Sequence, residues 1–348
     1  MVRPDPPYLH LESAFAQPAN FIPETQVWNR FPEYALDLYL ARGWFRSQHT
    51  MFVSYFMNAG EKIHDIVPLR IDLRNYRVPA KIEKMFRRLG EFEFWVSPFY
   101  PNAEFFELLR RYKHYEEFGY QWDHFESFKI TPPLFRTYEI KMKHNDRVAA
   151  IGLIDLGQRS AMGLLNIYDP EYGRYSPGKL LVAAKINWLQ SMHYRYFYPG
   201  YFVPGYAKFD YKLQFAPQAT EYIDFLDGHW KPIRQFGDHG PNRDILNQLQ
   251  QVQNSSKHPL HLRRNNQACF IHPLSHIFNL FEMPWYLSEH DLIGTENETV
   301  ISYHPSKKML EEIDIEWMDQ PMYEMLDPAA TTGKLMVATR RRPFPGLV

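Results

Sequence analysis

The chain has 348 residues, of which 45% are hydrophobic, 16% aromatic and 23% charged. This composition is typical of a globular protein with a sizeable core, and it excludes disorder of the whole chain. The 39 Lys and Arg residues against 40 Asp and Glu residues give a formal charge of −1, which excludes a basic coat for nucleic acid but not a local basic stripe. The single cysteine, Cys269, excludes an intrachain disulfide and a cluster of several cysteines.

Chain length and the distribution of polar loops predict how the chain is divided into regions. The N-terminal segment lacks the apolar stretch of a secretory signal, and no apolar run is long enough to span a membrane. We therefore expect a soluble, cytoplasmic protein. Polar loops become frequent after residue 225, so we expect a small N-terminal α/β region over residues 1–100, a core over residues 101–225 and a C-terminal extension over residues 226–348.

The N-terminal region mixes helical and strand periodicity. Apolar residues recur at helical spacing from residue 33 to Gly43, where a helix C-cap is expected. The other predicted elements are strands over residues 51–56, 66–73 and 91–96 and a short basic helix over residues 80–90.

The core shows the order helix, three strands, helix, strand. These elements are predicted over residues 101–120, 137–143, 147–155, 161–168, 177–189 and 194–198. The order resembles the GNAT acyltransferase fold, an α+β fold whose mixed, mainly antiparallel sheet is flanked by helices and opens between two strands. The opening leaves backbone groups free to hold an acyl donor. The helix that begins after Ser176 can bind a phosphate through its unpaired N–H groups, although an ordinary helix start with proline explains the same residues.

A set of ordered segments carries a more specific resemblance. The segments are residues 42–47 (RGWFRS), 68–71 (PLRI), 151–155 (IGLID), 168–172 (YDPEY), 176–178 (SPG) and 198–212 (YPGYFVPGYAKFDYK). In this order they resemble the arginyl-tRNA–protein transferase family, including its bacterial leucyl-transferring branch. The resemblance covers residues 30–220 and rests on order and spacing rather than on any one motif.

The resemblance implies an aminoacyltransferase that moves an amino acid from charged tRNA to the N-terminal amine of a protein or peptide, as in N-degron marking. Because the ester on the tRNA is already activated, such an enzyme must position two ends, remove a proton from the amine and stabilise an oxyanion. It needs aminoacyl-tRNA as donor substrate and no further cofactor.

The resemblance also assigns candidate residues. The catalytic candidates are Asp155, Lys208 and Tyr211, and the donor-binding candidates on matching motifs are Tyr168, Ser176, Gly178 and Lys212. A tyrosine can stack the terminal adenine, a lysine can face phosphate or developing charge, and Asp155 can orient an amine. Core packing is the alternative for the tyrosines, and a capping or ion-pair role is the alternative for Asp155.

Arginines and lysines supply the remaining candidates. Arg42, Arg46 and Arg70 match the N-terminal motifs, where a guanidinium can bind an acidic acceptor residue in bidentate fashion. Residues 70–90 carry seven basic and two acidic side chains, a net +5, which suits tRNA backbone contact. The tRNA-binding candidates in this stretch are Lys84, Arg87 and Arg88. A solvated helix or a salt bridge is the alternative for these residues.

The sequence also departs from the family. Residues 55–68 contain no cysteine, although the family carries metal-binding or cluster-binding cysteines there. A histidine-rich segment offers a zinc site as a minor alternative, through His258, His261, Cys269, His272 and His276. The basic residues 340–342 are expected to be a solvated tail.

Two other classes of function stay open. One is a GNAT-type acyltransferase with another activated donor such as acyl-CoA, although residues 174–179 lack the glycine-rich phosphate loop. The other is a non-catalytic binding protein that retains the fold, which the missing cysteines and the long extension favour.

Overall fold

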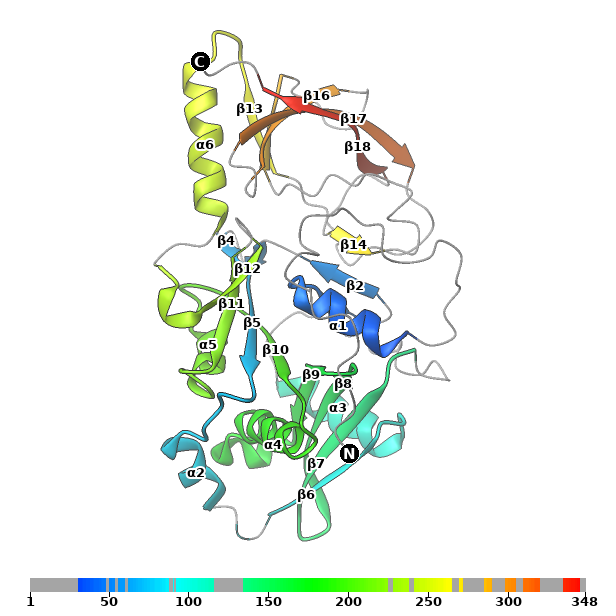
Figure 1. The fold of residues 1–348 in the computed structure, drawn as a ribbon. Coiled ribbons are helices and arrows are strands. Elements are labelled where there is room, and N and C mark those ends of the chain that lie inside the picture. Colours follow the sequence, from blue (N-terminus) through cyan, green and yellow to red (C-terminus); the bar gives the residue numbers. More distant parts are fainter. Residues whose placement is uncertain are drawn as a thin grey trace, which may run out of the picture.

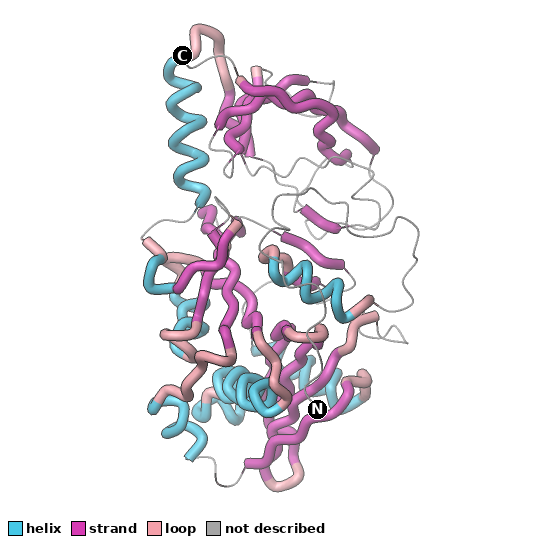
Figure 2. Tube along the Cα trace, in the orientation of Figure 1, coloured by secondary structure: helices cyan, strands magenta, loops and turns pink. Residues whose placement is uncertain are grey.

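The computed structural model describes residues 31–47, 50–53, 56–59, 62–87, 90, 92–115, 134–224, 228–237, 241–264, 269–271, 285–289, 298–304, 309–319 and 334–344. These residues form an α+β structure in which a large, mainly antiparallel sheet lies below a smaller sheet in the view of Figure 1. Figure 2 shows helices beside the large sheet and one long helix beside the smaller one.

The large sheet has eight strands in the order β12-β11-β5-β10-β9-β8-β7-β6. All neighbours are antiparallel except β9 and β10, which are parallel. In chain order the strands are β5 (Val67–Asp72), β6 (Phe92–Pro98), β7 (Thr137–His144), β8 (Arg147–Leu156), β9 (Ser160–Tyr168), β10 (Tyr196–Phe202), β11 (Thr220–Asp224) and β12 (His229–Pro232).

The region boundaries expected at residues 100 and 225 stay a prediction. The sheet extends across both positions, because β5 comes from before residue 100 and β12 from after residue 225.

Helices cover both faces of this sheet. The helix α4 (Pro177–Ser191) lies on one face with α2 (Ala80–Arg87) beside it, and α1 (Glu33–Ala41) and α3 (Ala103–Tyr115) lie on the other. The shorter helical turns of this part of the chain are η3 (Pro170–Tyr175), α5 (Ala207–Asp210), η4 (Tyr211–Gln214) and η5 (Ile233–Gln235).

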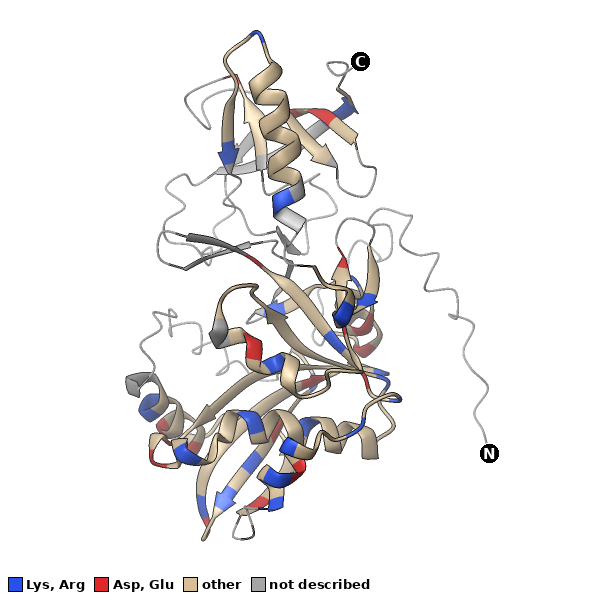
Figure 3. Cartoon of the chain, turned by 90° about the vertical axis from the view of Figure 1, so that its left-hand side faces the viewer, with Lys and Arg blue, Asp and Glu red and all other residues tan. Residues whose placement is uncertain are grey.

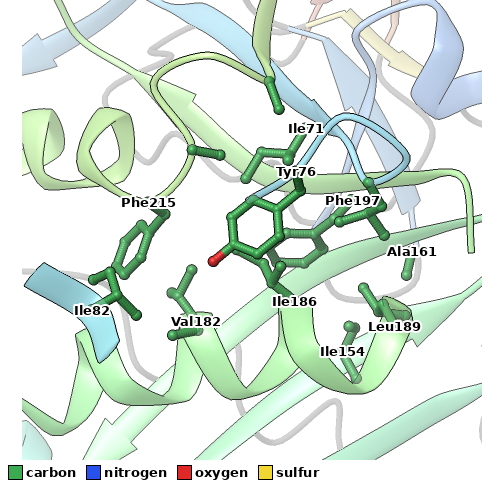
Figure 4. Packing of buried hydrophobic residues seen from close by; sticks show 14 of the residues in the cluster. Ile71, Tyr76, Ile82, Ile154, Ala161, Val182, Ile186, Leu189, Phe197 and Phe215 are labelled. Carbon is green, nitrogen blue, oxygen red and sulfur yellow. The ribbon is translucent and has the colours of Figure 1, made fainter. Parts of the chain in front are cut away.

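Alternation along β8 places its side chains in two cores. Ile154 packs with Val182 and Ile186 of α4, as Figure 4 shows, and its neighbour Leu153 packs with Phe105 of α3. Because successive strand residues point to opposite faces, a strand covered by helices on both sides is apolar along its whole length. Nine of the ten residues of β8 are buried, as expected for a central strand.

The helix α4 has clear start and stop signals. Pro177 occupies its first position, where the missing N–H costs no hydrogen bond. The helix ends where the N–H of Met192 donates to the carbonyl of Trp188 and His193 takes a left-handed φ of 57°. Its interior is apolar on most sides, which is typical of a helix buried in the core.

Two small sheets carry part of the N-terminal region. One is the hairpin β3 (Phe56–Ala59) and β4 (Lys62–Asp65). The other has the order β1-β2-β14 and joins β1 (Phe45–Ser47), β2 (Thr50–Val53) and β14 (Cys269–Ile271). The single strand predicted over residues 51–56 is therefore wrong, because residues 50–53 and 56–59 belong to separate strands.

The C-terminal extension contains a five-stranded antiparallel sheet that sequence patterning did not predict. Its order is β13-β15-β16-β17-β18. The helix α6 (Pro241–Ser255) packs on it through Ile245, Leu249 and Val252, which are spaced as one helical face. The strands are β13 (His261–Arg264), β15 (Trp285–Ser288), β16 (Glu298–His304), β17 (Met309–Asp319) and β18 (Lys334–Pro343).

The extension also reaches the N-terminal region. The strand β14 lies in the connection between β13 and β15, and Ile271 pairs with Met51 of β2, which pairs in turn with Arg46 of β1. None of the helices in the described part of the chain is long and apolar enough to cross a membrane.

Candidate functional site

The large sheet divides between its two parallel strands. Three residue pairs join β9 to β10, from Ser160 with Tyr196 to Met162 with Tyr198. Beyond Met162, β9 continues to Tyr168 without β10, whereas β10 shifts its register and follows β5. Gly200, at this register shift, has a φ of +96°, a conformation that favours glycine. In the described sheet, the pairing of β10 therefore changes from β9 and β5 together to β5 alone.

A carboxylate and a guanidinium are buried where the division begins. Asp155 of β8 is fully buried, and Nη1 of Arg46 donates to its two oxygens at 2.7 and 2.8 Å. The hydroxyl of Thr137 donates to the same carboxylate at 2.6 Å, and the guanidinium lies 4.1 Å from the ring centre of Phe135. Removing one partner of such a pair leaves an uncompensated buried charge.

The structure thereby joins two predicted residues from separate motifs. Arg46 belongs to the segment 42–47 and Asp155 to the segment 151–155. Because both oxygens of Asp155 are occupied, this carboxylate orients Arg46 in the structure.

Arg70 lies on the same face of the sheet, two strands from β9. Its Nε donates to Glu221 at 2.6 Å, and its guanidinium lies 4.2 Å from the ring of Tyr196 and 4.5 Å from that of Trp230. Burial raises the pKa of the neighbouring Tyr198, and Arg70 opposes this rise. The charge of Arg70 is therefore engaged by a carboxylate and two aromatic rings.

Trp230 ties this group to α1. Its indole N–H donates to the carbonyl of Ala41 at 2.8 Å, next to Arg42, the C-cap residue of α1. The three predicted acceptor-binding arginines thus lie at the C-cap of α1, in β1 and in β5.

Of the donor-binding candidates, Tyr168 is the last residue of β9, whereas Ser176 and Gly178 lie at the start of α4. Tyr168 comes six positions after Met162, a distance of roughly 20 Å along a strand. Tyr168 packs edge-on against Tyr112, with ring centres 4.9 Å apart. Ser176 caps α4 in a left-handed conformation without a side-chain hydrogen bond to the helix, and an added Cβ at Gly178 would meet nothing within 4 Å.

A lysine lies over the β10 side of the division. Nζ of Lys212 donates to the carbonyl of Tyr201 at 2.6 Å and lies 5.0 Å from the rings of both Tyr201 and Phe209. A Cβ added at Gly200 would come within 3.4 Å of this Nζ. Burial lowers the pKa of Lys212 to about 7, so an uncharged amine is accessible at neutral pH.

The other predicted residues of this segment are described unequally. Tyr211 is partly buried and packs edge-on against Phe215 at 6.0 Å, in agreement with the packing alternative. Lys208 lies in α5, and its side chain is outside the described part of the chain.

The basic helix has exposed charges. Lys84 and Arg87 of α2 are exposed, and Arg87 makes a 3.9 Å ion pair with Glu83. Arg88 lies outside the described residues. Figure 3 shows basic and acidic residues intermingled over the helices of the large unit. Arg70 contacts Glu221, which lies outside residues 70–90, and Arg74 contacts Asp72, one of the two acidic side chains already counted in the net charge of this stretch.

The predicted zinc alternative is only partly within the described chain. His258 is exposed and His261 begins β13, whereas His272 and His276 lie outside the described residues and Cys269 is described by its backbone alone. Among the side chains that the structure describes, no three metal-ligating residues gather.

Sequence reasoning missed the buried Lys185 as a candidate residue. Lys185 of α4 is 1% exposed, and its Nζ donates to the carbonyl oxygens of Leu153 and Leu165 and to Oδ1 of Asn166. Burial lowers its pKa to about 7, and the Asp155 carboxylate opposes the decrease. A single lysine within the apolar run of residues 180–186 is the signal that marks it.

The sheet in which β9 and β10 stop pairing after Met162, with a buried ion pair at that point, defines an α+β core rather than a full activity. The sequence family described as arginine-tRNA-protein transferase, C terminus, matches residues 104–222. The core is thus related to the C-terminal part of these transferases, and the resemblance carried by the motifs is confirmed.

Several bacterial proteins share this similarity. An aspartate/glutamate leucyltransferase of Pseudomonas fluorescens is 24% identical over 213 residues, 57% of this chain and 87% of the relative. One of Acinetobacter baylyi is 22% identical over 172 residues, 48% of this chain and 62% of the relative. One of Xylella fastidiosa is 24% identical over 184 residues, 50% of this chain and 70% of the relative. The chain thus spans less than two thirds of the Acinetobacter relative.

Solved structures show only weak similarity. The C-terminal domain of a putative lysylphosphatidylglycerol synthetase from Agrobacterium fabrum has a TM-score of 0.31 and 14% identity, covering 39% of this chain and 46% of that domain. A GCN5-related glucosamine N-acetyltransferase region of a fungal β-N-acetylglucosaminidase has a TM-score of 0.28 and 15% identity, covering 52% of this chain and 22% of that protein. Scores of this size do not establish a shared fold.

Proposed function

We propose that this protein is an aminoacyl-tRNA-dependent transferase with a GNAT-like core. In this proposal it moves an amino acid from charged tRNA in the cytoplasm to the N-terminal amine of a protein or peptide, as in N-degron marking. The observation that carries the proposal is the buried contact between Arg46 and Asp155. It joins two motifs that lie 109 residues apart, at the division of a core that matches a transferase family.

The reaction requires little from the protein beyond positioning and charge. The α-amine of the acceptor attacks the ester carbonyl, a C–N bond forms, and the C–O bond to the ribose breaks. The amine loses a proton, and the leaving oxygen of the tRNA gains one. The transient oxyanion needs a donor or a cation nearby.

The proposed roles follow the two sides of the division. Arg46, held by Asp155, and Arg70 and Arg42 beside it form the acceptor side. Tyr168 at the end of β9 and Ser176 and Gly178 at the start of α4 form the donor side, where the N–H groups of α4 face the phosphates. Asp155 acts in this proposal through Arg46 rather than by touching an amine.

Lys212 provides the proton step in this proposal, and Lys208 and Tyr211 of the same segment remain candidates beside it. With a pKa near 7, the uncharged amine of Lys212 can accept a proton from the attacking amine, and its population increases as pH rises through 7. The protonated form can instead stabilise negative charge, which requires the opposite pH dependence.

The ratio of wild-type to Lys212→Met transfer rates is expected to rise between about pH 6 and about pH 8, because Lys212 loses its proton in this interval. The acceptor amine also titrates near pH 8, and comparing the two proteins removes its contribution. Single-turnover rates at five pH values check this expectation. A ratio that is constant, or that falls with pH, excludes Lys212 as the base.

Neutralising the exposed basic residues of α2 is expected to weaken tRNA binding. Lys84→Gln with Arg87→Gln removes two charges, so the affinity should fall by about tenfold near physiological salt and the logarithmic salt slope by about two. Titrations with labelled tRNA at four salt concentrations measure both quantities. Glu83→Gln in the same helix is the matched control and should increase affinity. An unchanged salt slope of tRNA binding in the double variant would show that tRNA does not contact Lys84 and Arg87.

Ligand preference tests the proposal as a whole. The protein is titrated with aminoacyl-tRNA, deacylated tRNA and acetyl-CoA in parallel. Aminoacyl-tRNA is expected to bind and to label a peptide with a free N-terminus but not the same peptide after N-acetylation. Binding of acetyl-CoA alone would support the other acyltransferase class. Binding of charged tRNA without transfer to any peptide would support a non-catalytic role.

A further inference from the structure

The lysine in the buried face of α4 has a complete set of hydrogen-bond acceptors. Nζ of Lys185 donates to the carbonyl of Leu153 at 2.8 Å, to the carbonyl of Leu165 at 3.1 Å and to Oδ1 of Asn166 at 2.7 Å. A protonated lysine has three N–H donors and no acceptor. The three acceptors of the site therefore match the three N–H donors of an ammonium group.

These acceptors lie at an irregularity between β8 and β9. Leu153 pairs with Leu165, whereas the next residue, Ile154, pairs with Gly163. Such a register shift removes backbone groups from the regular ladder, and a buried carbonyl without a partner is costly. The lysine binds one carbonyl from each strand at this position.

Two of these acceptors, Leu165 and Asn166, lie in the half of β9 that does not pair with β10. Pairing with β10 stops at Met162, and Leu165 and Asn166 follow it. Because residues 163–168 have β8 as their one strand neighbour in the described sheet, their position depends on β8 and on contacts from the helices. Lys185 supplies a polar contact from α4 to this half of the strand.

A glycine makes room for the lysine. A Cβ added at Gly152 would lie 2.9 Å from Cε of Lys185 and 2.8 Å from Oδ1 of Asn166. Both distances are shorter than real Cβ contacts, so a side chain at Gly152 would displace the lysine. The glycine of the segment 151–155 therefore belongs to the same arrangement.

We infer that Lys185 is a positioning residue. It fixes residues 163–168, the free half of β9 that no longer pairs with β10, to β8 and α4, and so determines how this half of β9 lies relative to β10. Packing alone does not explain an amine here, because an apolar side chain of similar length fills such a space without the cost of burying a polar or charged group. Asp155, on the same strand as Leu153, is the charged group that acts on Lys185. The inference rests on the proposed function for its effect on transfer, and on geometry alone for its effect on β9.

Backbone hydrogen exchange tests the positioning directly, without any assay of activity. In Lys185→Met, the amides of residues 163–168 are expected to exchange at least about tenfold faster than in the wild type, whereas those of β5 and β11 keep their rates. Asn166→Leu should show part of this effect, and the double variant should add little to Lys185→Met because the two residues share one interaction. Lys141→Met, which removes a partly buried lysine paired with Glu104, is the matched control.

Two results would overturn the inference. One is unchanged exchange over residues 163–168 in Lys185→Met. The other is an acceleration of all amides together, which would make Lys185 a contributor to global stability alone.

Kinetics then connects the strand to the reaction. The KM for aminoacyl-tRNA is expected to rise about tenfold in Lys185→Met, with the KM for the peptide unchanged, because the free half of β9 lies on the donor side. A lower folded fraction would reduce the rate but leave both KM values as they are. If the wild type transfers nothing, the proposed function has failed, and the exchange result alone decides the role of Lys185.

Discussion

A variant that combines Arg46→Met, Asp155→Leu and Thr137→Val is expected to be nearly as stable as the wild type and to have lost at least about a hundredfold in transfer rate. Arg46→Met alone and Asp155→Leu alone are each expected to lose about 3–5 kcal/mol of unfolding free energy. The contrast separates what the buried pair does for stability from what it does for the reaction.

The reason lies in the burial of both charges. Asp155 is fully buried and the Arg46 side chain is 6% exposed, so a single replacement strands one charge in an apolar environment. Replacing the whole polar group by apolar side chains removes the desolvation cost together with the attraction. Thr137 is included because its hydroxyl donates to Asp155 and would otherwise lack this acceptor.

Urea unfolding and single-turnover transfer measure the two effects. Arg136→Met, which removes a partly exposed arginine paired with Glu33, is the control and should change neither by much. A combined variant that transfers at the wild-type rate would show that the pair is structural only.

Gly157→Ala is expected to destabilise the protein by about 3 kcal/mol through overpacking. Gly157 lies in the turn between β8 and β9, and a Cβ there would come within 2.0 Å of Oδ1 of Asp37 and 3.1 Å of the carbonyl of Glu33. Both contacts belong to α1, so the helix would have to move as a unit.

The contact with Asp37 is not a flexible one. Its carboxylate accepts hydrogen bonds from the backbone N–H groups of Gln158, Arg159 and Ser160 at 3.2, 3.0 and 3.1 Å. These bonds attach α1 to the turn, and a displaced Asp37 would leave several donors without their acceptor. The loss should therefore exceed that of an ordinary surface Gly→Ala change.

Thermal and urea unfolding of Gly157→Ala and Gly173→Ala provide the comparison. An added Cβ at Gly173 would meet nothing within 4 Å, so this control should be close to the wild type. Equal stability of the two variants would contradict the close packing of α1 against the turn.

Local patterns predicted the core elements because each is encoded over a short stretch. The helix expected over residues 177–189 is α4 (Pro177–Ser191), and the two strands joined at Asn145 and Asp146 are β7 and β8. Both turn residues have positive φ angles, as asparagine and aspartate tolerate in turns. A division of the sheet was expected from the resemblance of this order to the GNAT acyltransferase fold.

Long-range pairing could not be predicted from local patterns. Asp155 was expected to orient an amine or to form an ion pair, and Arg46 to bind an acceptor residue or to form a salt bridge. The structure pairs the two with each other, and the partner is what the sequence did not indicate. Nothing local in either motif indicates a partner 109 residues away. The hydrogen bonds of the buried Lys185 could not be predicted for a related reason, because its backbone acceptors are carbonyls on two different strands.

The sheet of the C-terminal extension was not recognised from the sequence because its strands carry many charged residues. Residues 340–342 were expected to be a solvated tail. Arg340 and Arg341 are exposed, but all three residues belong to β18, where Arg342 donates to Glu312 at 2.6 Å and to Asp314 at 2.8 Å. Charged residues opposite each other on neighbouring strands stabilise the pair, and they mask the apolar alternation by which strands are recognised.

The most direct test of the central claim is the mass of a peptide after incubation with the purified protein and aminoacyl-tRNAs. A peptide with a free N-terminus is expected to gain the mass of one amino-acid residue at its N-terminus, with one tRNA deacylated for each modified peptide. The N-acetylated peptide should gain nothing. Deacylation of tRNA without modified peptide, or no reaction with any charged tRNA by protein shown to be folded, would contradict the assignment as an aminoacyl-tRNA-dependent transferase.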